Sequence, residues 1–172
     1  MLFIPDINDT RTDIIVEVRF FGILFALWKG KNYQIYWNMR VKITIEMGKD
    51  GEFHSVNKKV EEMNPKELIL YATAMCASIT MKGILDKEHI VPKSAEIEMS
   101  GVLDTEQVMA KSIYRSFNIL YRIECSTLSE QSKIGRAVNL TTEKYCGTLQ
   151  MLRRIAPLSH EVSIVSIETE GY

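Results

Sequence analysis

The chain has 172 residues, and 46% of them are hydrophobic, which is enough for one domain with a substantial core. Its formal net charge of −1 provides no basic surface of the kind that binds nucleic acid. Three cysteines in a chain of this length do not make the disulfide framework of a small secreted protein, and we expect a reducing, cytoplasmic compartment.

The first 38 residues are interpreted as an N-terminal extension, 1–38, that precedes the domain at 39–172. Residues 16–20 alternate between apolar and polar side chains, and a turn at 29–32 leads to a second strand at 33–37, so this segment predicts an extra β-hairpin. Its uninterrupted apolar stretch is too short to cross a bilayer, which takes about 20 residues, so no membrane partner is expected. A second hypothesis is that Met39 is the true initiator and that the extension is absent from the native protein.

A second hairpin follows the extension. Residues 40–47 alternate, with Val41, Ile43 and Ile45 on one face, as in a half-buried strand. The sequence Gly-Lys-Asp-Gly at 48–51 is a tight-turn signal, and 52–56 can return as the partner strand.

The central helix is predicted to begin at Asn64. Asparagine is a favoured N-cap, Pro65 occupies the first helical position, and Glu67 lies three residues after the cap, which completes a capping box. Residues 68–84 have almost no polar face, which is typical of a helix buried nearly all round. Because a single sheet covers one side of a helix, we expect a second subunit to cover the other side, giving a homodimer.

The second half of the chain is predicted to contain three further strands and two helical segments. Residues 94–103 and 116–125 predict strands, 129–139 and 141–155 predict helices that are continuous or joined by a kink, and 160–168 predicts a last strand. The order of elements indicates an α+β fold in which helices pack on an antiparallel sheet, with a buried central helix.

Cys76 and Cys146 are the candidate reactive groups. Cys76 lies about three turns into the central helix, beyond the reach of its dipole, whereas Cys146 is near the start of its own helix if Thr141 caps that helix. Two thiols that approach each other can carry out redox chemistry, since a thiolate attacks a peroxide and a second thiol resolves the product. The alternative is core packing, which spacing alone favours because cysteine is among the most buried residues. Cys125 has no motif around it and is interpreted as structural.

Three charged residues are candidate partners of a thiolate. Glu67 is explained by the capping box alone, but a carboxylate there could also orient a catalytic cation. Arg40 and Lys49 lie on the hairpin at 40–56 and could stabilise a thiolate, although most hairpin cations are simply solvated. The three histidines have no metal-ligand spacing, and no phosphate-binding loop is present, so neither a metal nor a cofactor is expected.

Two motifs resemble those of the OsmC/Ohr family of osmotically induced and organic-hydroperoxide-resistance proteins, in its divergent OsmC-like branch. The first is Asn-Pro-x-Glu-Leu at 64–68 followed by Cys76, and the second is Glu-Lys-Tyr-Cys at 143–146 followed by Leu-Arg at 152–153. The resemblance covers about residues 39–168. It implies an OsmC-like fold with a six-stranded sheet in each subunit, and an intertwined homodimer with two active sites at the interface.

The resemblance also implies thiol-dependent reduction of organic hydroperoxides. By position, Cys76 would be the peroxidatic thiolate and Cys146 the resolving thiol, and a dithiol reductant, lipoyl-type in the better-known branch, would restore both. The peroxidase branch has an arginine in a Gly-Arg-Asp-Gly-like turn, where this chain has Lys49, and Arg40 is a possible substitute. This departure motivates two alternatives, a non-enzymatic dimer that binds a small apolar ligand and a redox sensor.

Overall fold

A computed structural model describes residues 39–56 and 58–167 of the chain. These residues all belong to one structural unit, residues 35–172. The hairpin predicted at 1–38 lies outside the described residues, and the extension and its boundary at residue 39 stay predictions.

The described residues contain a five-stranded sheet with the order β2-β1-β3-β4-β5. The strands are β1 (Arg40–Met47), β2 (Phe53–Ser55), β3 (Ser94–Leu103), β4 (Tyr114–Cys125) and β5 (Leu158–Ser166). The predicted hairpin is present, with Gly51 in the left-handed conformation at its turn. The strands predicted at 94–103, 116–125 and 160–168 are confirmed to within two residues.

The prediction of a wholly antiparallel sheet is wrong at one position. The pairs β1–β2, β1–β3 and β3–β4 are antiparallel, but β5 runs parallel to β4, with Phe117 opposite Leu158. Parallel neighbours need a crossover connection, and here the helical segment between β4 and β5 supplies it. The periodicity of a strand predicts which of its faces is buried but carries no information about its direction.

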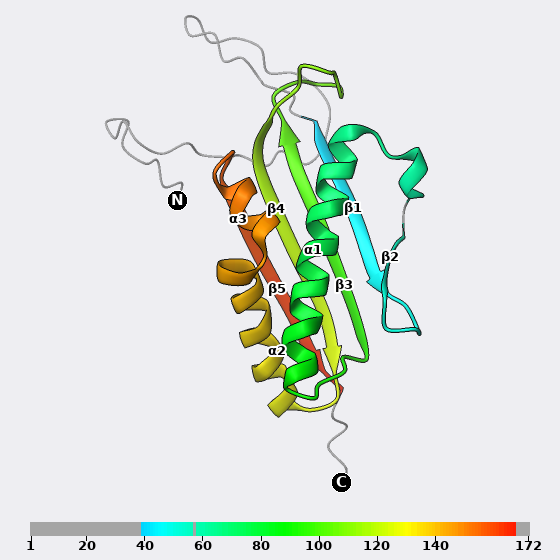
Figure 1. The fold of residues 1–172 in the computed structure, drawn as a ribbon, viewed down its shortest axis with the longest axis vertical. Coiled ribbons are helices and arrows are strands. Elements are labelled where there is room, and N and C mark those ends of the chain that lie inside the picture. The colour runs from blue at the N-terminus through cyan, green and yellow to red at the C-terminus, as the bar shows by residue number, and fades with distance from the viewer. Residues whose placement is uncertain (1–38, 57, 168–172) are drawn as a thin grey trace, which may run out of the picture. The chain divides into compact units, whose positions relative to one another are not determined.

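Helices cover one face of the sheet (Figure 1). They are α1 (Pro65–Lys87), α2 (Leu128–Leu140) and α3 (Gly147–Arg153), with a short η1 (Val60–Glu62) before α1 and a single π-helical turn, η2 (Thr141–Tyr145), between α2 and α3. The core fills the space between these helices and the sheet, and its buried strand residues include Ile43, Ile45, Ile97, Met99 and Ile119. Each large apolar side chain removed from water in this way contributes about 1.5–3 kcal/mol. The α+β architecture predicted from the sequence is therefore confirmed.

The start of α1 follows the prediction. The side chain of Asn64 accepts hydrogen bonds from the backbone N–H groups of Lys66 and Glu67, and the Glu67 carboxylate accepts from the N–H of Asn64 at 2.8 Å. Pro65 occupies the first turn. The capping box sets the point at which the chain enters the helix, and therefore the position of every residue along it.

The burial of α1 is one-sided within a single chain. Leu70, Ala74 and Met81 pack into the core, whereas Ile69 is 43% exposed and Ile79 is 63% exposed. Of the helices in the described ranges, α1 is the one that is long and apolar enough to cross a membrane, a test that core helices also pass. Complete burial of α1 is thus not reached within one chain.

Candidate active site

Two cysteines that are 70 positions apart in the sequence lie side by side in the structure. The Sγ atom of Cys146 donates a hydrogen bond to the Sγ atom of Cys76 over 3.3 Å, and both thiols are free. Cys76 comes from the middle of α1, and Cys146 from the junction of η2 and α3, which packs against α1 (Figure 1). Cys146 is completely buried, while Cys76 is partly exposed to solvent. Access from outside therefore leads to Cys76 first.

A break in the helical segment places Cys146. The N–H of Cys146 donates to the carbonyl oxygen of Thr141 at 3.0 Å, which closes the π turn of η2, and the chain then becomes extended at Cys146 itself. The side chain of Gln150 donates to the carbonyl oxygen of Thr142 at 3.1 Å, and the Thr142 hydroxyl donates to the hydroxyl of Tyr121. Turns of this kind occur frequently at functional sites.

This break corrects one expectation. The position of Cys146 near the start of its helix was predicted on the condition that Thr141 caps that helix, but Thr141 has helical backbone angles and lies buried at the end of α2. Cys146 takes the N-cap position of α3 instead. Cys146 therefore does lie at the start of its helix, but the condition on Thr141 is wrong, because the sequence does not show that residues 141–145 form a π turn.

Thr148 is a site residue that the sequence motifs did not indicate. Its Oγ1 atom lies 3.2 Å from the Sγ of Cys146, and Thr148 follows Cys146 by two residues. Burial by itself raises the pKa of Cys76, but the nearby donor groups of Thr148, the Cys146 thiol and the Thr80 hydroxyl outweigh that effect. The pKa of Cys76 therefore lies below its ordinary value.

The pKa of Cys146 shifts in the opposite direction. Burial raises the pKa of this thiol, and the neighbouring Cys76 raises it further, against the lowering effect of Thr148 and the N–H of Leu149. When the pair loses its first proton, the remaining proton stays on the buried sulfur of Cys146. The first negative charge therefore belongs on the partly exposed Cys76. This is the polarity that a reactive thiolate with a neutral neighbour requires.

Glu67 lies at the start of α1, away from the sulfur pair. Besides its role in the capping box, it accepts a hydrogen bond from the Nζ of Lys58 at 2.9 Å. Burial raises the pKa of Glu67, but Lys58 and the N–H of Asn64 more than offset this and hold the pKa below its ordinary value. Nine residues of helix place Glu67 about 14 Å along the axis from Cys76 and roughly 180° around it. Within one chain, Glu67 therefore does not reach the thiolate.

The two candidate cations lie apart from each other. Arg40 opens β1, and Lys49 follows its end, in an exposed turn. The two ends of β1 are about 24 Å apart, so only one of these cations could serve a given thiolate within a chain. In the described part of the chain, no lysine or arginine donates a hydrogen bond to either sulfur. Lys58, in the connector before α1, is the cation that the structure pairs with Glu67, and its position in sequence gave no signal of this.

An ion pair encloses the Cys146 segment. Arg153 at the end of α3 donates two hydrogen bonds to the Glu143 carboxylate in η2, at 2.7 and 2.6 Å. The Nε of Arg153 is buried, and His160 on β5 lies 3.7 Å from the same carboxylate. Residues on both sides of Cys146 are thus joined by a bidentate pair.

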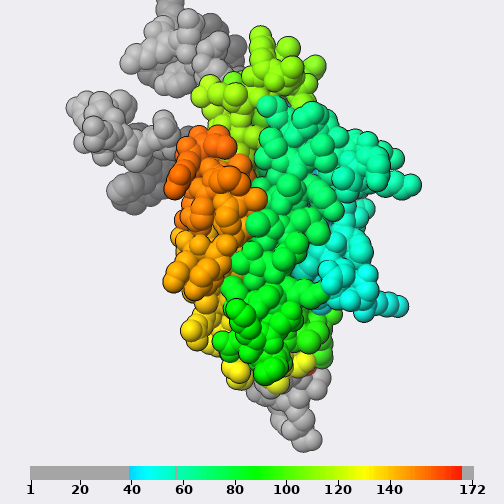
Figure 2. All heavy atoms as spheres, viewed as in Figure 1, coloured from blue at the N-terminus to red at the C-terminus, as the bar shows by residue number. Residues whose placement is uncertain are grey.

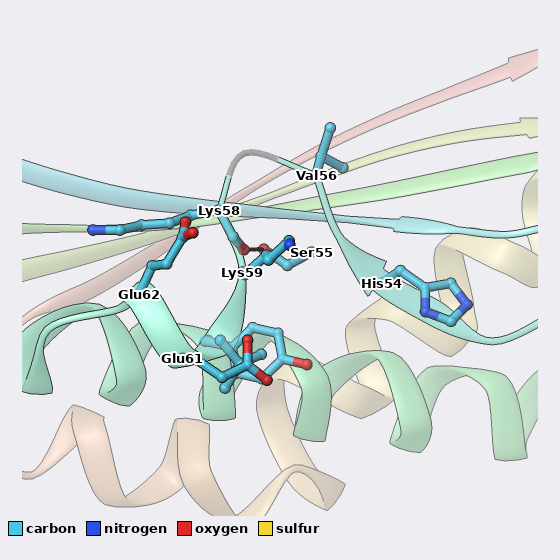
Figure 3. Close-up of a pocket in the computed structure, with 9 residues that line it drawn as sticks. His54, Ser55, Val56, Lys58, Lys59, Glu61 and Glu62 are labelled. Carbon is cyan, nitrogen blue, oxygen red and sulfur yellow. Dashed lines mark hydrogen bonds between the residues drawn. The ribbon is translucent and has the colours of Figure 1, made fainter.

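The described residues also contain a pocket that does not include the cysteines. A cavity of about 460 Å³ lies between the end of β2, η1 and α1, and Figure 3 shows its lining side chains, among them Lys58, Lys59, Glu61 and Glu62. Its charges are of both signs and largely exposed. In the same described part of the chain, no group of three histidine, cysteine or acidic residues is arranged to hold a metal ion.

Comparison with known proteins places the chain in a structural class. A family model described as OsmC-like protein matches residues 57–161, and no curated protein sequence matches the chain. A hypothetical protein from Aquifex aeolicus VF5 is similar in structure, with a TM-score of 0.52 and 24% identity over 76% of this chain and 100% of that one. An OsmC-like protein from Mycoplasma pneumoniae has a TM-score of 0.50 and 13% identity over 74% of this chain and 96% of that one. At these identities the likeness establishes the fold.

Proposed function

The chain belongs to the OsmC-like family, and on that premise we propose that it is a thiol peroxidase that reduces organic hydroperoxides. Family membership supports a redox role in general. The observation that carries the specific proposal is the 3.3 Å approach of a partly exposed sulfur, Cys76, to a fully buried one, Cys146. A structural pair of core cysteines would not need one member partly exposed to solvent.

The first step uses Cys76. Its thiolate attacks the terminal oxygen of the hydroperoxide, so that an S–O bond forms and the O–O bond breaks. The departing alkoxide takes a proton and leaves as the alcohol, and Cys76 becomes a sulfenic acid. The lowered pKa of Cys76 supports this role because the thiolate, not the thiol, is the nucleophile.

The second step uses Cys146. Its sulfur attacks the sulfenic acid of Cys76, an S–S bond forms, and the hydroxyl group leaves as water after taking up the proton of the Cys146 thiol. The existing contact between the two sulfurs means that little movement is needed. An external dithiol, of the lipoyl type by resemblance to the family, would then reduce the disulfide and return both thiols.

A homodimer is part of the proposal. The outer side of α1 runs through the middle of the face seen in Figure 2. Ile69 and Ile79 on α1 are 43% and 63% exposed, and Met151 on α3 and Ile155, two residues after the end of α3, are more than half exposed. A second copy of the chain would remove these side chains from water. Glu67, which does not reach the thiolate within one chain, would lie beside a thiolate only if the partner subunit brought it there.

The test is a thiol count on purified protein before and after one equivalent of an organic hydroperoxide, with peptide mapping of any disulfide. We expect a rapid loss of two thiols and a link between Cys76 and Cys146, while the buried Cys125 stays reduced and serves as the internal control. Three unchanged thiols would overturn the peroxidase proposal and favour the alternative of a non-enzymatic dimer that binds a small apolar ligand. Oxidation without recycling by any dithiol would favour a redox sensor.

A further inference from the structure

We propose that Thr148 is a further catalytic residue of the second step, in which its hydroxyl group donates a hydrogen bond to the sulfur of Cys146 while that sulfur forms the disulfide. This inference rests on the proposed function, because it concerns a step of the same reaction. It follows from the contact between the two side chains, from the burial of Cys146 and from the engagement of the neighbouring hydroxyl groups elsewhere.

The Thr148 hydroxyl touches the sulfur that resolves the sulfenic acid. Its Oγ1 atom lies 3.2 Å from the Sγ of Cys146, and Thr148 belongs to the first turn of α3. The Cys146 thiol has one proton, which it donates to the Sγ of Cys76. In the contact with Thr148, the Cys146 sulfur is therefore the acceptor and the hydroxyl is the donor.

The second step places a negative charge on a sulfur that water does not reach. To attack the sulfenic acid of Cys76, the Cys146 thiol gives up its proton, because the thiolate is the nucleophile. Cys146 is completely buried, and a buried charge without a hydrogen-bond donor is costly. Burial raises the pKa of Cys146 for this reason, and the Thr148 hydroxyl acts against the rise.

The neighbouring hydroxyl groups on α1 and η2 have other positions or other partners. Thr80 donates to a backbone carbonyl oxygen of α1 at 2.7 Å, and Thr142 donates to a tyrosine hydroxyl on β4 at 3.1 Å. Because a hydroxyl has one proton, neither has a proton left for the Cys146 sulfur. The Thr141 hydroxyl is buried and has no hydrogen-bond partner within the described ranges. Thr148 is therefore the hydroxyl that serves this sulfur.

The chemistry balances with Thr148 as a donor that keeps its own proton. The Cys146 sulfur attacks the Cys76 sulfur, so that an S–S bond forms and the S–O bond of the sulfenic acid breaks. The electron pair of the S–O bond leaves with the hydroxyl group, which takes up the proton released by Cys146 and departs as water. Removal of the Thr148 hydroxyl should therefore slow this conversion.

The experiment follows disulfide formation in the full chain after rapid mixing with one equivalent of tert-butyl hydroperoxide. Dimedone traps the sulfenic acid in quenched samples, and peptide mass mapping quantifies the Cys76–Cys146 link. Thr148→Val keeps the shape of the side chain but removes the hydroxyl. We expect conversion of the sulfenic acid to the disulfide at pH 7 to be about tenfold slower, as for the loss of one hydrogen bond to a charged group. The midpoint of its pH profile should move to higher pH, and Thr148→Ser should restore both.

Thr73→Val is the matched control. Thr73 lies on α1, the helix that carries Cys76, and its hydroxyl donates to the carbonyl oxygen of Ile69 at 2.8 Å. The variant thus loses a threonine hydroxyl whose proton is engaged away from the sulfurs. We expect its rate of conversion to match that of the wild type.

An unchanged conversion rate in Thr148→Val would overturn the inference, as would an equal slowing in Thr73→Val or a failure of Thr148→Ser to restore the rate. Slowing of sulfenic acid formation alone would also overturn it, because that is the first step. If Thr148→Val does not fold, as judged by circular dichroism, the comparison of Thr148→Ala with Thr148→Ser replaces it.

The same measurement separates this inference from the proposed function. If the wild type forms the disulfide and Thr148→Val forms it equally fast, the inference fails alone. If the wild type does not react with the hydroperoxide, the proposed function fails and the inference fails with it.

Discussion

The Sγ of Cys146 approaches the Sγ of Cys76 to 3.3 Å because the helical segment after β4 breaks at Cys146 and turns that residue toward α1. The pair is asymmetric, since Cys146 is completely buried and Cys76 is partly exposed. The hydrogen bond between the sulfurs and the burial of Cys146 shift the two pKa values apart. Because of this asymmetry, we expect substitution of Cys76 and substitution of Cys146 to have different effects on the reaction.

Cys76→Ser should abolish turnover of an organic hydroperoxide, because it removes the nucleophile. Cys146→Ser should allow one oxidation at Cys76 and then stall, and excess hydroperoxide should drive Cys76 to the sulfinic acid. Intact mass spectrometry would detect the added oxygens, and Cys125→Ser provides the control with both site thiols present. Full activity in Cys76→Ser would contradict the assignment of the nucleophile.

The ion pair between Arg153 and Glu143 should affect the second oxidation step more than the first. Arg153→Met frees the segment around Cys146, so we expect disulfide formation to slow several-fold while sulfenic acid formation at Cys76 is little changed. The free energy of unfolding should fall by about 1 kcal/mol or less, because both side chains are partly exposed.

Rapid-mixing measurements with a sulfenic acid probe would separate these two steps. Arg154→Met is the matched control, because Arg154 is the next residue, carries the same charge and is exposed. Equal effects of the two substitutions on disulfide formation would count against a positioning role of the ion pair.

Gly101→Ala should destabilise the domain. A Cβ atom at Gly101 on β3 would lie 2.5 and 2.6 Å from ring carbons of Tyr114, whose ring packs against Phe117 and whose hydroxyl donates to the carbonyl oxygen of Lys66. Displacing this ring should cost about 1–3 kcal/mol. Gly83→Ala on α1 is the control, since nothing lies within 4 Å of its added Cβ and alanine favours a helix. Urea denaturation of both variants would check the prediction, and equal stabilities would contradict it.

The lowered pKa of Glu67 predicts that the free energy of unfolding depends on pH. Its pKa is depressed in the folded state, so it contributes stability above its unfolded pKa of about 4.3, and that contribution is lost as the pH falls through the folded value. Glu67→Gln keeps a side chain that can complete the capping box but removes the charge. The difference in free energy of unfolding between wild type and Glu67→Gln should therefore shrink as the pH falls from 6 to about 3. A constant difference across this range would show that the charge of Glu67 contributes nothing.

Local features of the sequence were sufficient for the start of α1 and for most strand boundaries. A capping box is made by Asn64 and Glu67 alone, and alternation within a strand depends on neighbours in sequence. The two motifs around Cys76 and Cys146 were also sufficient to indicate the family that the comparison confirmed. Each of these inferences needs information from only a few neighbouring residues or from the spacing within a short motif.

Contacts between distant segments were decided by the tertiary structure. The parallel direction of β5 and the 3.3 Å separation of the two sulfurs depend on how the segment between β4 and β5 crosses the sheet. Likewise, the sequence offered Arg40 and Lys49 as cations, but folding paired Lys58 with Glu67 and placed Thr148 against the Cys146 thiol. The physical reason is that helix capping and strand alternation are set by local hydrogen bonding and side-chain periodicity, whereas these contacts form only when separate elements pack around a common core.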